Sequence, residues 1–283
     1  MTNVIACIDG SSASKGVIDS AAWASAKLSA PLTLLHVIEE GNANSPQDMS
    51  GNIGLGSREK LMEELAELDA KKAKLLLEEG HYLLEQAKKQ ALTNDKVHDI
   101  SMRQRHGEFT ESVLALEPET RLLVLGLHGE DHAKGDHIGS QLETLLRRVH
   151  KPILLSPDIF VKPESAMLAY DGSGTSKRGI ELLSKSPLFS GMPIHVVMVG
   201  ADSDTNKEEL TWAEKTLRDG GHKVKTAIVA GDVESALHEY QDKHNIGLMI
   251  MGAYGHSKIR QFLVGSTTTS MLEQSKTPLL ILR

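Results

Sequence analysis

The sequence is poor in cysteine, in aromatic residues and in basic charge, and each shortage removes a class of protein. A single cysteine, Cys7, excludes an intrachain disulfide and any zinc site built from several cysteines. Aromatic residues make up 4% of the chain, too few for the stacking platforms that bind single-stranded nucleic acid. The formal net charge of −7 argues against a dedicated nucleic-acid binder, which needs a clustered basic surface.

Long apolar runs and several common catalytic motifs are also missing. No run approaches the roughly 18 apolar residues that span a bilayer, and the chain does not start with the basic and apolar parts of a signal peptide. We therefore expect a cytoplasmic protein without a membrane partner. The P-loop pattern, a Gly-x-Gly-x-x-Gly after a first strand and the Gly-x-Ser-x-Gly elbow do not occur, which disfavours P-loop NTPases, dinucleotide dehydrogenases and α/β-hydrolases.

The chain contains an internal repeat. The segment 4–11, which ends in Asp-Gly-Ser, recurs as segment 166–173, and His36-Val37 is echoed by His195-Val196. Five further pairs share one offset of 126 residues, namely Gly126/Gly252, Gly129/Gly255, Gly139/Gly265, Ser140/Ser266 and Pro152/Pro278. A constant offset without a gap predicts two homologous domains, residues 1–156 and 157–283.

Each half alternates short apolar runs with segments of helical periodicity. In the first half we expect strands at 4–8, 32–37, 97–103, 122–126 and 153–155, and helices at about 14–30, 108–116 and 140–149. This alternation predicts an α/β fold in which each domain is a five-stranded parallel, Rossmann-like sheet flanked by helices.

Residues 41–95 form an insertion that the second half lacks. Glycine, asparagine, serine and proline between 41 and 56 indicate a loop. Leucines at nearly helical spacing between 57 and 92 predict a long helix, broken near Gly80. We expect this helix to pack on the sheet. The alternative is an arm that binds a partner or a second copy.

Three features of each half fall at the carboxyl ends of predicted strands, where doubly wound sheets bind ligands. They are the Asp-Gly-Ser turn, the His-Val pair and the glycine series. The glycine series is the most specific, because its turn lets backbone N–H groups approach a ligand and Gly265-Ser266 opens a helix whose N-terminus attracts phosphate. We interpret His36 and His195 as hydrogen-bonded core side chains.

The spacing Gly-2x-Gly-9x-Gly-Ser, present in both halves, resembles the nucleotide-binding signature of the universal stress protein family. The Leu-Leu-His-Val strand, the aspartate after the first strand and the closing segment 277–281 resemble that family as well. The resemblance covers nearly the whole chain except about 41–95, so the chain is similar to a tandem universal stress protein. It implies a role in survival under stress, ATP binding in some members and, in most, no established catalytic reaction.

The family's nucleotide contacts, carried over to this chain, imply a site for ATP or a related adenine nucleotide in each half, with Mg²⁺ as an optional companion. The aspartate would lie beside sugar and phosphates, the valine would hydrogen-bond adenine through its backbone, and the glycine series would hold ribose and phosphates. These residues are Asp171, Val196, Gly252, Gly255, Gly265, Ser266 and Thr267 in the second half, and Asp9, Val37, Gly126, Gly129, Gly139, Ser140 and Gln141 in the first. The alternative explanation for both aspartates is helix capping.

The two implied sites differ in charge. The spacer before the third glycine carries Lys258 and Arg260 in the second half (+2), and in the first half it carries Lys134 with three acids (−2), which are Glu130, Asp131 and Asp136. Four charges at ~0.5 kcal/mol each give about 2 kcal/mol, or roughly thirtyfold in affinity. We expect nucleotide mainly in the second domain.

Three hypotheses of function follow. The first is a regulatory module that binds nucleotide without obligatory turnover, so that no catalytic residue and no metal site are assigned. The second is a slow ATPase or autokinase that uses the same pocket. The third is an interaction protein with a vestigial first site, which would bind zinc through His128, His132 and His137; a solvated loop is the expected alternative.

The resemblance also implies an architecture, since single-domain relatives pair through their last strands. Edge strands seek partners. We therefore expect strands 153–155 and 279–282 to pair antiparallel within one chain, giving an intrachain pseudo-dimer with pseudo-twofold symmetry. Association of two such chains into a homodimer is left open.

Overall fold

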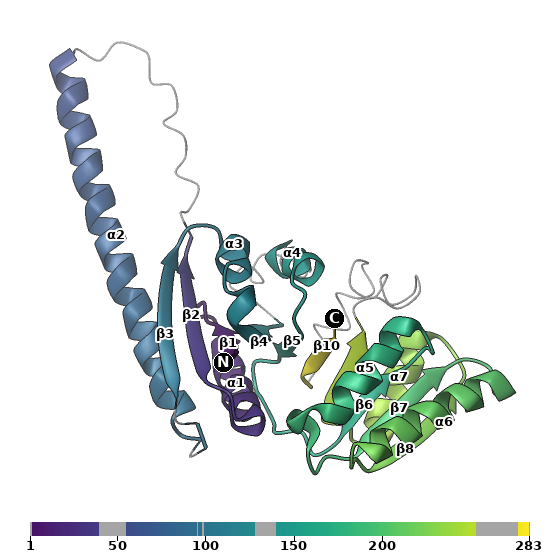
Figure 1. Ribbon diagram of the computed structural model, residues 1–283. Helices are drawn as coiled ribbons and strands as arrows, with labels where there is room; N and C mark the ends of the chain where they lie inside the picture. The colour runs from purple at the N-terminus through teal and green to yellow at the C-terminus, as the bar shows by residue number, and fades with distance from the viewer. Residues whose placement is uncertain are drawn as a thin grey trace.

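A computed structural model describes residues 2–39, 55–94, 96–97, 99–127, 140–252 and 277–282. Short apolar runs form the strands and amphipathic segments form the helices (Figure 1). The first half contains β1 (Asn3–Cys7), α1 (Ser14–Leu28), β2 (Leu32–Ile38), α2 (Leu55–Ala91), β3 (Ile100–His106), α3 (Phe109–Leu114), β4 (Thr120–Gly126), α4 (Ser140–Arg148) and β5 (Ile153–Ser156). The second contains β6 (Ala166–Ala169), α5 (Gly174–Lys185), β7 (Ile194–Val199), α6 (Asp204–Asp219), β8 (Val224–Val229), α7 (Val233–Lys243), β9 (Leu248–Gly252) and β10 (Leu279–Leu282).

The ten strands of the described residues join one sheet in the order β3-β2-β1-β4-β5-β10-β9-β6-β7-β8. Neighbouring strands within each half are parallel, as the α/β prediction requires. The two halves meet where β5 and β10 run antiparallel, with Leu154 opposite Leu280. The strand order therefore reads the same from either end, and the predicted pairing of the last strands with pseudo-twofold symmetry is confirmed.

Helices cover both faces of this sheet. One core contains side chains from α1, α2, α5 and α6 and includes residues of both halves. The other lies beneath α3, α4 and α7. Alternate residues of β1 feed the two cores, Val4 and Ala6 on one face and Ile5 and Cys7 on the other. A sheet covered on both faces explains why its central strands are continuous apolar runs.

The segment between β5 and β6 is pinned to α1. A Cβ on Gly16 would overlap the Pro157 carbonyl oxygen, so only glycine lets the helix lie this close to the connection. The Trp23 ring packs on Phe160 with centroids 5.7 Å apart, and Lys27 donates a 2.8 Å hydrogen bond to the Ser190 carbonyl. The first half therefore contacts the second through α1 as well as through the sheet.

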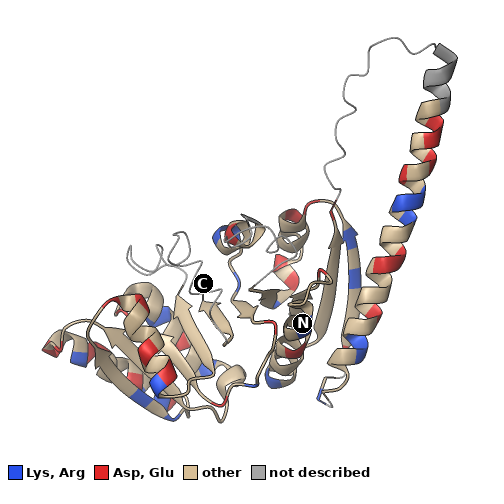
Figure 2. Cartoon of the chain, turned by 180° about the vertical axis from the view of Figure 1, so that it is seen from behind, with Lys and Arg blue, Asp and Glu red and all other residues tan. Residues whose placement is uncertain are grey.

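Helix α2 is continuous, so the expected break near Gly80 is wrong. Gly80 is buried against the sheet, and an added Cβ would overlap the Gln104 amide nitrogen and lie 2.5 Å from His36 Cδ2. The glycine therefore allows a close approach rather than ending the helix. The last part of α2 packs on β2, β3 and α1, whereas its first part extends beyond the domain (Figure 1, Figure 2). Of the loop expected at 41–56, residues 41–54 lie outside the described residues, and residues 55 and 56 belong to α2 instead.

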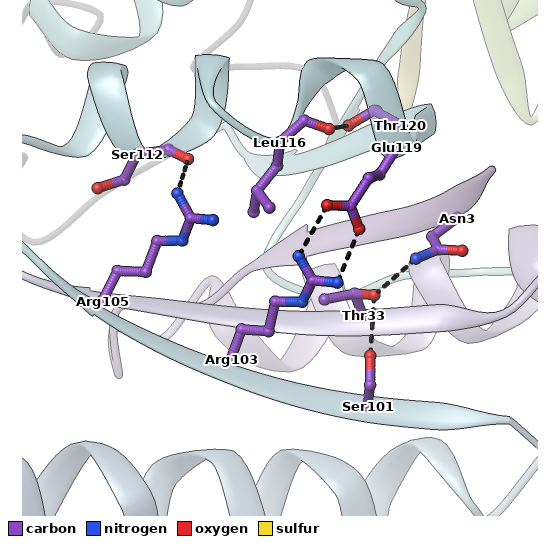
Figure 3. Close-up of polar contacts among 9 residues, drawn as sticks. All are labelled: Asn3, Thr33, Ser101, Arg103, Arg105, Ser112, Leu116, Glu119 and Thr120. Atoms are coloured by element: carbon purple, nitrogen blue, oxygen red, sulfur yellow. Dashed lines mark hydrogen bonds and ion pairs between the residues drawn. The ribbon is translucent and has the colours of Figure 1, made fainter.

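Strand β3 forms one edge of the sheet and begins three residues later than predicted. Val97 is buried but precedes the strand, whereas the strand itself is largely polar, as suits an edge. Figure 3 shows Arg103 paired with Glu119 through hydrogen bonds of 3.2 and 2.7 Å, and Ser101 bonded to Thr33 at 3.0 Å. Polar contacts with neighbouring elements therefore fix an edge strand that hydrophobicity alone locates poorly.

Two absences apply to the described ranges. None of the helices in those ranges combines the length and the apolar character needed to cross a membrane. In the same part of the chain, no group of three His, Cys, Asp or Glu side chains is placed to hold a metal ion. The histidines of the zinc hypothesis, His128, His132 and His137, lie outside it.

Candidate functional site

Each half has a point where the strand order reverses, and the candidate residues gather at its carboxyl edge. In the first half the chain moves outward from β1 to β2 and β3, then returns to β4 on the other side of β1. The second half does the same around β6. Register brings Cys7 opposite Leu35 and Ala6 opposite Val124, so Asp9, Val37 and Gly126 lie close to the carboxyl ends of β1, β2 and β4 at one edge. Ligands of doubly wound sheets bind at such a crevice.

The aspartates sit in matching turns after β1 and β6. Asp9 Oδ1 accepts hydrogen bonds from Ser11 N at 3.0 Å, Ser11 Oγ at 2.7 Å and Ser14 Oγ at 2.9 Å. The following Gly10 has φ of 84°, in the left-handed region that glycine adopts without strain. The carboxylate is exposed although its turn is rigidly bonded.

Asp171 repeats this arrangement with slightly different partners. Its Oδ1 accepts from Ser173 N at 3.0 Å, and Gly172 has φ of 73°. Burial raises the pKa of Asp171, but hydrogen bonds from Ser173 and Ser176 outweigh it and leave the pKa below its usual value. Neither aspartate caps the next helix directly, because α1 follows Ala13 without a side-chain cap and α5 is capped by Ser173. The capping explanation is therefore wrong in its direct form.

The equivalence of Val37 and Val196 is corrected by the sheet register. Cys7, two residues before Asp9, pairs with Leu35, and Ala169, two residues before Asp171, pairs with Val197. Val37 therefore corresponds to Val199, the last residue of β7. Val196 lies inside that strand with no exposed surface. The echo between His36-Val37 and His195-Val196 is thus three residues out of register, because a run of similar apolar residues aligns equally well in several ways.

The two histidines are hydrogen-bonded, as expected. His36 Nδ1 lies 2.8 Å from the Ile8 carbonyl oxygen, just before the Asp9 turn. His195 is buried and its Nδ1 lies 3.0 Å from the Tyr240 hydroxyl. Burial, followed by the charges of Lys225 and His244, lowers the pKa of His195. Both side chains are part of the packing rather than open at the edge.

The glycine series is described only where it begins. Gly126 and Gly252 end β4 and β9 at the carboxyl edge, and Ser140 is the first residue of α4, as predicted. The other predicted members lie outside the described residues, and they are Gly129, Gly139, Gly255, Gly265, Ser266 and Thr267. The described part thus supplies both strand ends and one helix start.

Glu39 lies at the candidate site and was not singled out from the sequence. It follows β2 directly, and its Oε1 accepts a 2.6 Å hydrogen bond from Gln141 Nε2 and a 3.3 Å bond from Phe109 N. This carboxylate therefore joins the end of β2 to the first turn of α4. The same register that matches Val37 with Val199 places Ala201 at the corresponding position of the second half. The sequence offered one signal for Glu39, because it is an acidic residue just after a predicted strand.

The corner beside each aspartate turn also differs between the halves. In the second half, Glu209 of α6 accepts hydrogen bonds from the Tyr170 hydroxyl at 2.9 Å and Lys177 Nζ at 2.8 Å. A Cβ on Gly172 would lie 3.5 Å from Glu209 Cγ. In the first half a Cβ on Gly10 would instead meet the apolar end of Leu83 at 3.2 Å. One turn is therefore bordered by a paired carboxylate and the other by leucine.

Comparisons with known proteins agree with this geometry. The universal stress protein family matches residues 1–157 and 198–283. A universal stress protein of Synechocystis sp. is 32% identical over 289 residues that span both chains entirely. One of Methanocaldococcus jannaschii is 29% identical over 77 residues, covering 27% of this chain and 48% of its own. The crystal structure of a universal stress protein from Archaeoglobus fulgidus superposes with a TM-score of 0.65 at 17% identity, covering 99% of this chain and 96% of the other.

Proposed function

The chain belongs to the universal stress protein family as a tandem member, and from that membership we propose that it binds ATP or a related adenine nucleotide. The observation that carries the proposal is the convergence of an exposed aspartate, a strand end and a glycine at each switch point. Binding there serves regulation of a cytoplasmic stress response and requires no turnover.

We propose further that the second half holds the nucleotide more tightly. The spacer charges are −2 in the first half and +2 in the second. Glu39 lowers the charge around the first site to −3, whereas Ala201 at the matching position adds none. In the second half the extra acid, Glu209, is neutralised by Lys177. A polyanionic ligand favours the less negative of two otherwise similar sites.

The direct test is calorimetric titration with Mg·ATP on the whole chain and on a matched pair of variants, Asp171→Asn and Asp9→Asn. Asparagine keeps an acceptor oxygen for the serine hydrogen bonds, so each turn is retained. We expect Asp171→Asn to weaken the tight binding about tenfold, because loss of the charged acceptor beside the nucleotide's sugar outweighs the gain from a less negative site, and Asp9→Asn to leave it unchanged. Titration without heat, together with no nucleotide released from the denatured protein, would refute the proposal. Loss of the tight site in the Asp9 variant alone would reverse the ranking.

Turnover is measured separately. Incubation of the protein with ATP over hours should leave the nucleotide intact and the chain unphosphorylated. Stoichiometric ADP that disappears in the Gly265→Asp variant would replace regulatory binding by a slow ATPase or autokinase. The titration measures nucleotide binding, whereas the turnover assay measures hydrolysis and phosphorylation. The proposal of binding and the proposal that no turnover is required can therefore be refuted independently.

A further inference from the structure

The first part of α2 has no counterpart in the second half. Helix α6, which occupies the equivalent place after β7, is 16 residues long, whereas α2 has 37. Among the α2 side chains that the structure describes, 61–91, the buried ones all lie in the last 16 residues, 76–91. Every side chain from 61 to 75 is exposed, and we call this segment the arm. Figure 1 shows it standing clear of the sheet and its other helices.

The arm exposes an apolar stripe. Its members are 44–63% exposed, and they are Leu61, Met62, Leu65, Leu68 and Leu75. The leucines follow the heptad spacing 61, 65, 68 and 75, and Lys72 takes the one remaining seam position. Helical geometry turns this seam by about a third of a revolution from the face that buries Leu84, Ala87 and Ala91. The packing of α2 on its own domain therefore leaves the leucines uncovered.

The charges of the arm are separated into two blocks. Residues 61–69 contain four acids and no base, namely Glu63, Glu64, Glu67 and Asp69. Residues 70–75 contain three bases and no acid, namely Lys71, Lys72 and Lys74. Figure 2 shows the acidic block followed by the basic block along the protruding helix. The acidic block of one copy therefore has a charge opposite to that of the basic block of a second copy that runs in the opposite direction.

We propose that the arm binds the arm of a second copy of this chain as an antiparallel pair. A twofold axis near residue 70 places the basic block of each arm beside residues 65–70 of the other, which carry Glu67 and Asp69, with Leu65 opposite Leu75 and Leu68 opposite Lys72. A parallel pair would set like charges together, which disfavours it. The seam buries Leu65, Leu68 and Leu75 of both arms, and a lysine at one seam position selects register, as polar residues do in coiled coils. The interface is isologous and closes as a dimer.

This dimer is distinct from the pairing of the two halves. The halves meet inside one chain through β5 and β10, which leaves those edges filled. The arm instead projects from the far side of the first half, beyond β3, where the charged edge of the sheet discourages strand pairing. A helical arm therefore offers a way to join two chains that the sheet does not provide.

The test is the mass of the whole chain in solution, by light scattering and sedimentation at about 1–100 µM. We expect a dimer that Leu65→Gln with Leu68→Gln converts to monomer, raising the dissociation constant at least about 100-fold. The matched control is Leu182→Gln, an exposed leucine on α5, which should leave the dimer intact. Far-UV circular dichroism and thermal unfolding verify that both variants keep the fold. A monomeric native chain, or a dimer indifferent to the arm leucines, would refute the proposal.

Charge reversal tests whether the partner is a second arm, and cysteine cross-linking tests whether the two arms are antiparallel. Reversing Glu63, Glu64 and Glu67 to lysine should abolish the dimer, as should reversing the three lysines to glutamate, and mixing the two variants should restore a pair. In an antiparallel pair Lys71→Cys cross-links to itself under mild oxidation, whereas Glu64→Cys, one heptad away, does not. Cross-linking of Glu64→Cys, or its absence in Lys71→Cys, would overturn the antiparallel register. The native chain is a clean control, because its one thiol, Cys7, is buried with a raised pKa.

Discussion

At the scale of single residues, Gly80 shows how tertiary packing reverses a helix preference. In an isolated helix, Gly→Ala gains up to about 1 kcal/mol. At Gly80 the new methyl group would overlap Gln104 and crowd His36, whose ring is held by the Ile8 carbonyl. We expect Gly80→Ala to lower the free energy of unfolding by about 1–3 kcal/mol, measured by urea denaturation. Gly174→Ala is the control, because its Cβ meets nothing within 4 Å. Equal effects of the two substitutions would contradict the packing argument.

At the scale of elements, β7 and α7 are joined by a buried histidine that makes stability depend on pH. His195 contacts Tyr240 and His244 of the α7 end, and Lys225 of β8 faces it. Its folded pKa lies below the ordinary value of about 6.5, so the unfolded chain binds the proton more readily. The associated stability is therefore complete above pH 6.5 and is lost as the pH falls toward the folded pKa.

The expected result is a smaller pH dependence in the His195→Gln variant. The free energy of unfolding of the native chain should fall from about pH 6.5 downward, and the variant should show a shallower fall in the same interval. Urea denaturation at fixed pH values measures both slopes. His81→Gln, an exposed histidine on α2, should retain the native slope. Parallel curves for the native and His195→Gln chains would show that this histidine titrates alike in both states.

At the scale of the whole molecule, the sheet and both cores run through both halves, so the halves should unfold together. Each half has one tryptophan, Trp23 in α1 and Trp212 in α6. In the single-tryptophan variants Trp212→Phe and Trp23→Phe, we expect urea transitions by fluorescence to coincide with those by circular dichroism. Leu154→Asp, which buries a charge at the β5–β10 junction, should separate the two fluorescence transitions. Separate transitions in the native sequence would show that the halves unfold independently.

The sequence by itself determined the α/β class and the repeat, and the resemblance to the universal stress proteins implied the pairing of the last strands. The class follows from local periodicity, which is visible in single segments, and the pairing agrees with the need of a short apolar edge strand to be covered. It also located Asp9, Asp171, Gly126 and Gly252, because each follows directly on a strong apolar run. The same locality explains the error at β3, whose polar edge sequence gives a weak signal.

Only the tertiary structure decided which residues are equivalent and which meet. Val199, not Val196, matches Val37, because register is set by pairing along the strand and not by similarity of apolar letters. Glu39 reaches Gln141 across 102 positions of sequence. The arm of α2 was decided in the same way, since a leucine stripe predicts a buried face but does not say whether any element lies opposite it. A side chain is buried only where another surface covers it. For residues 61–75, the described part of the chain supplies no covering surface.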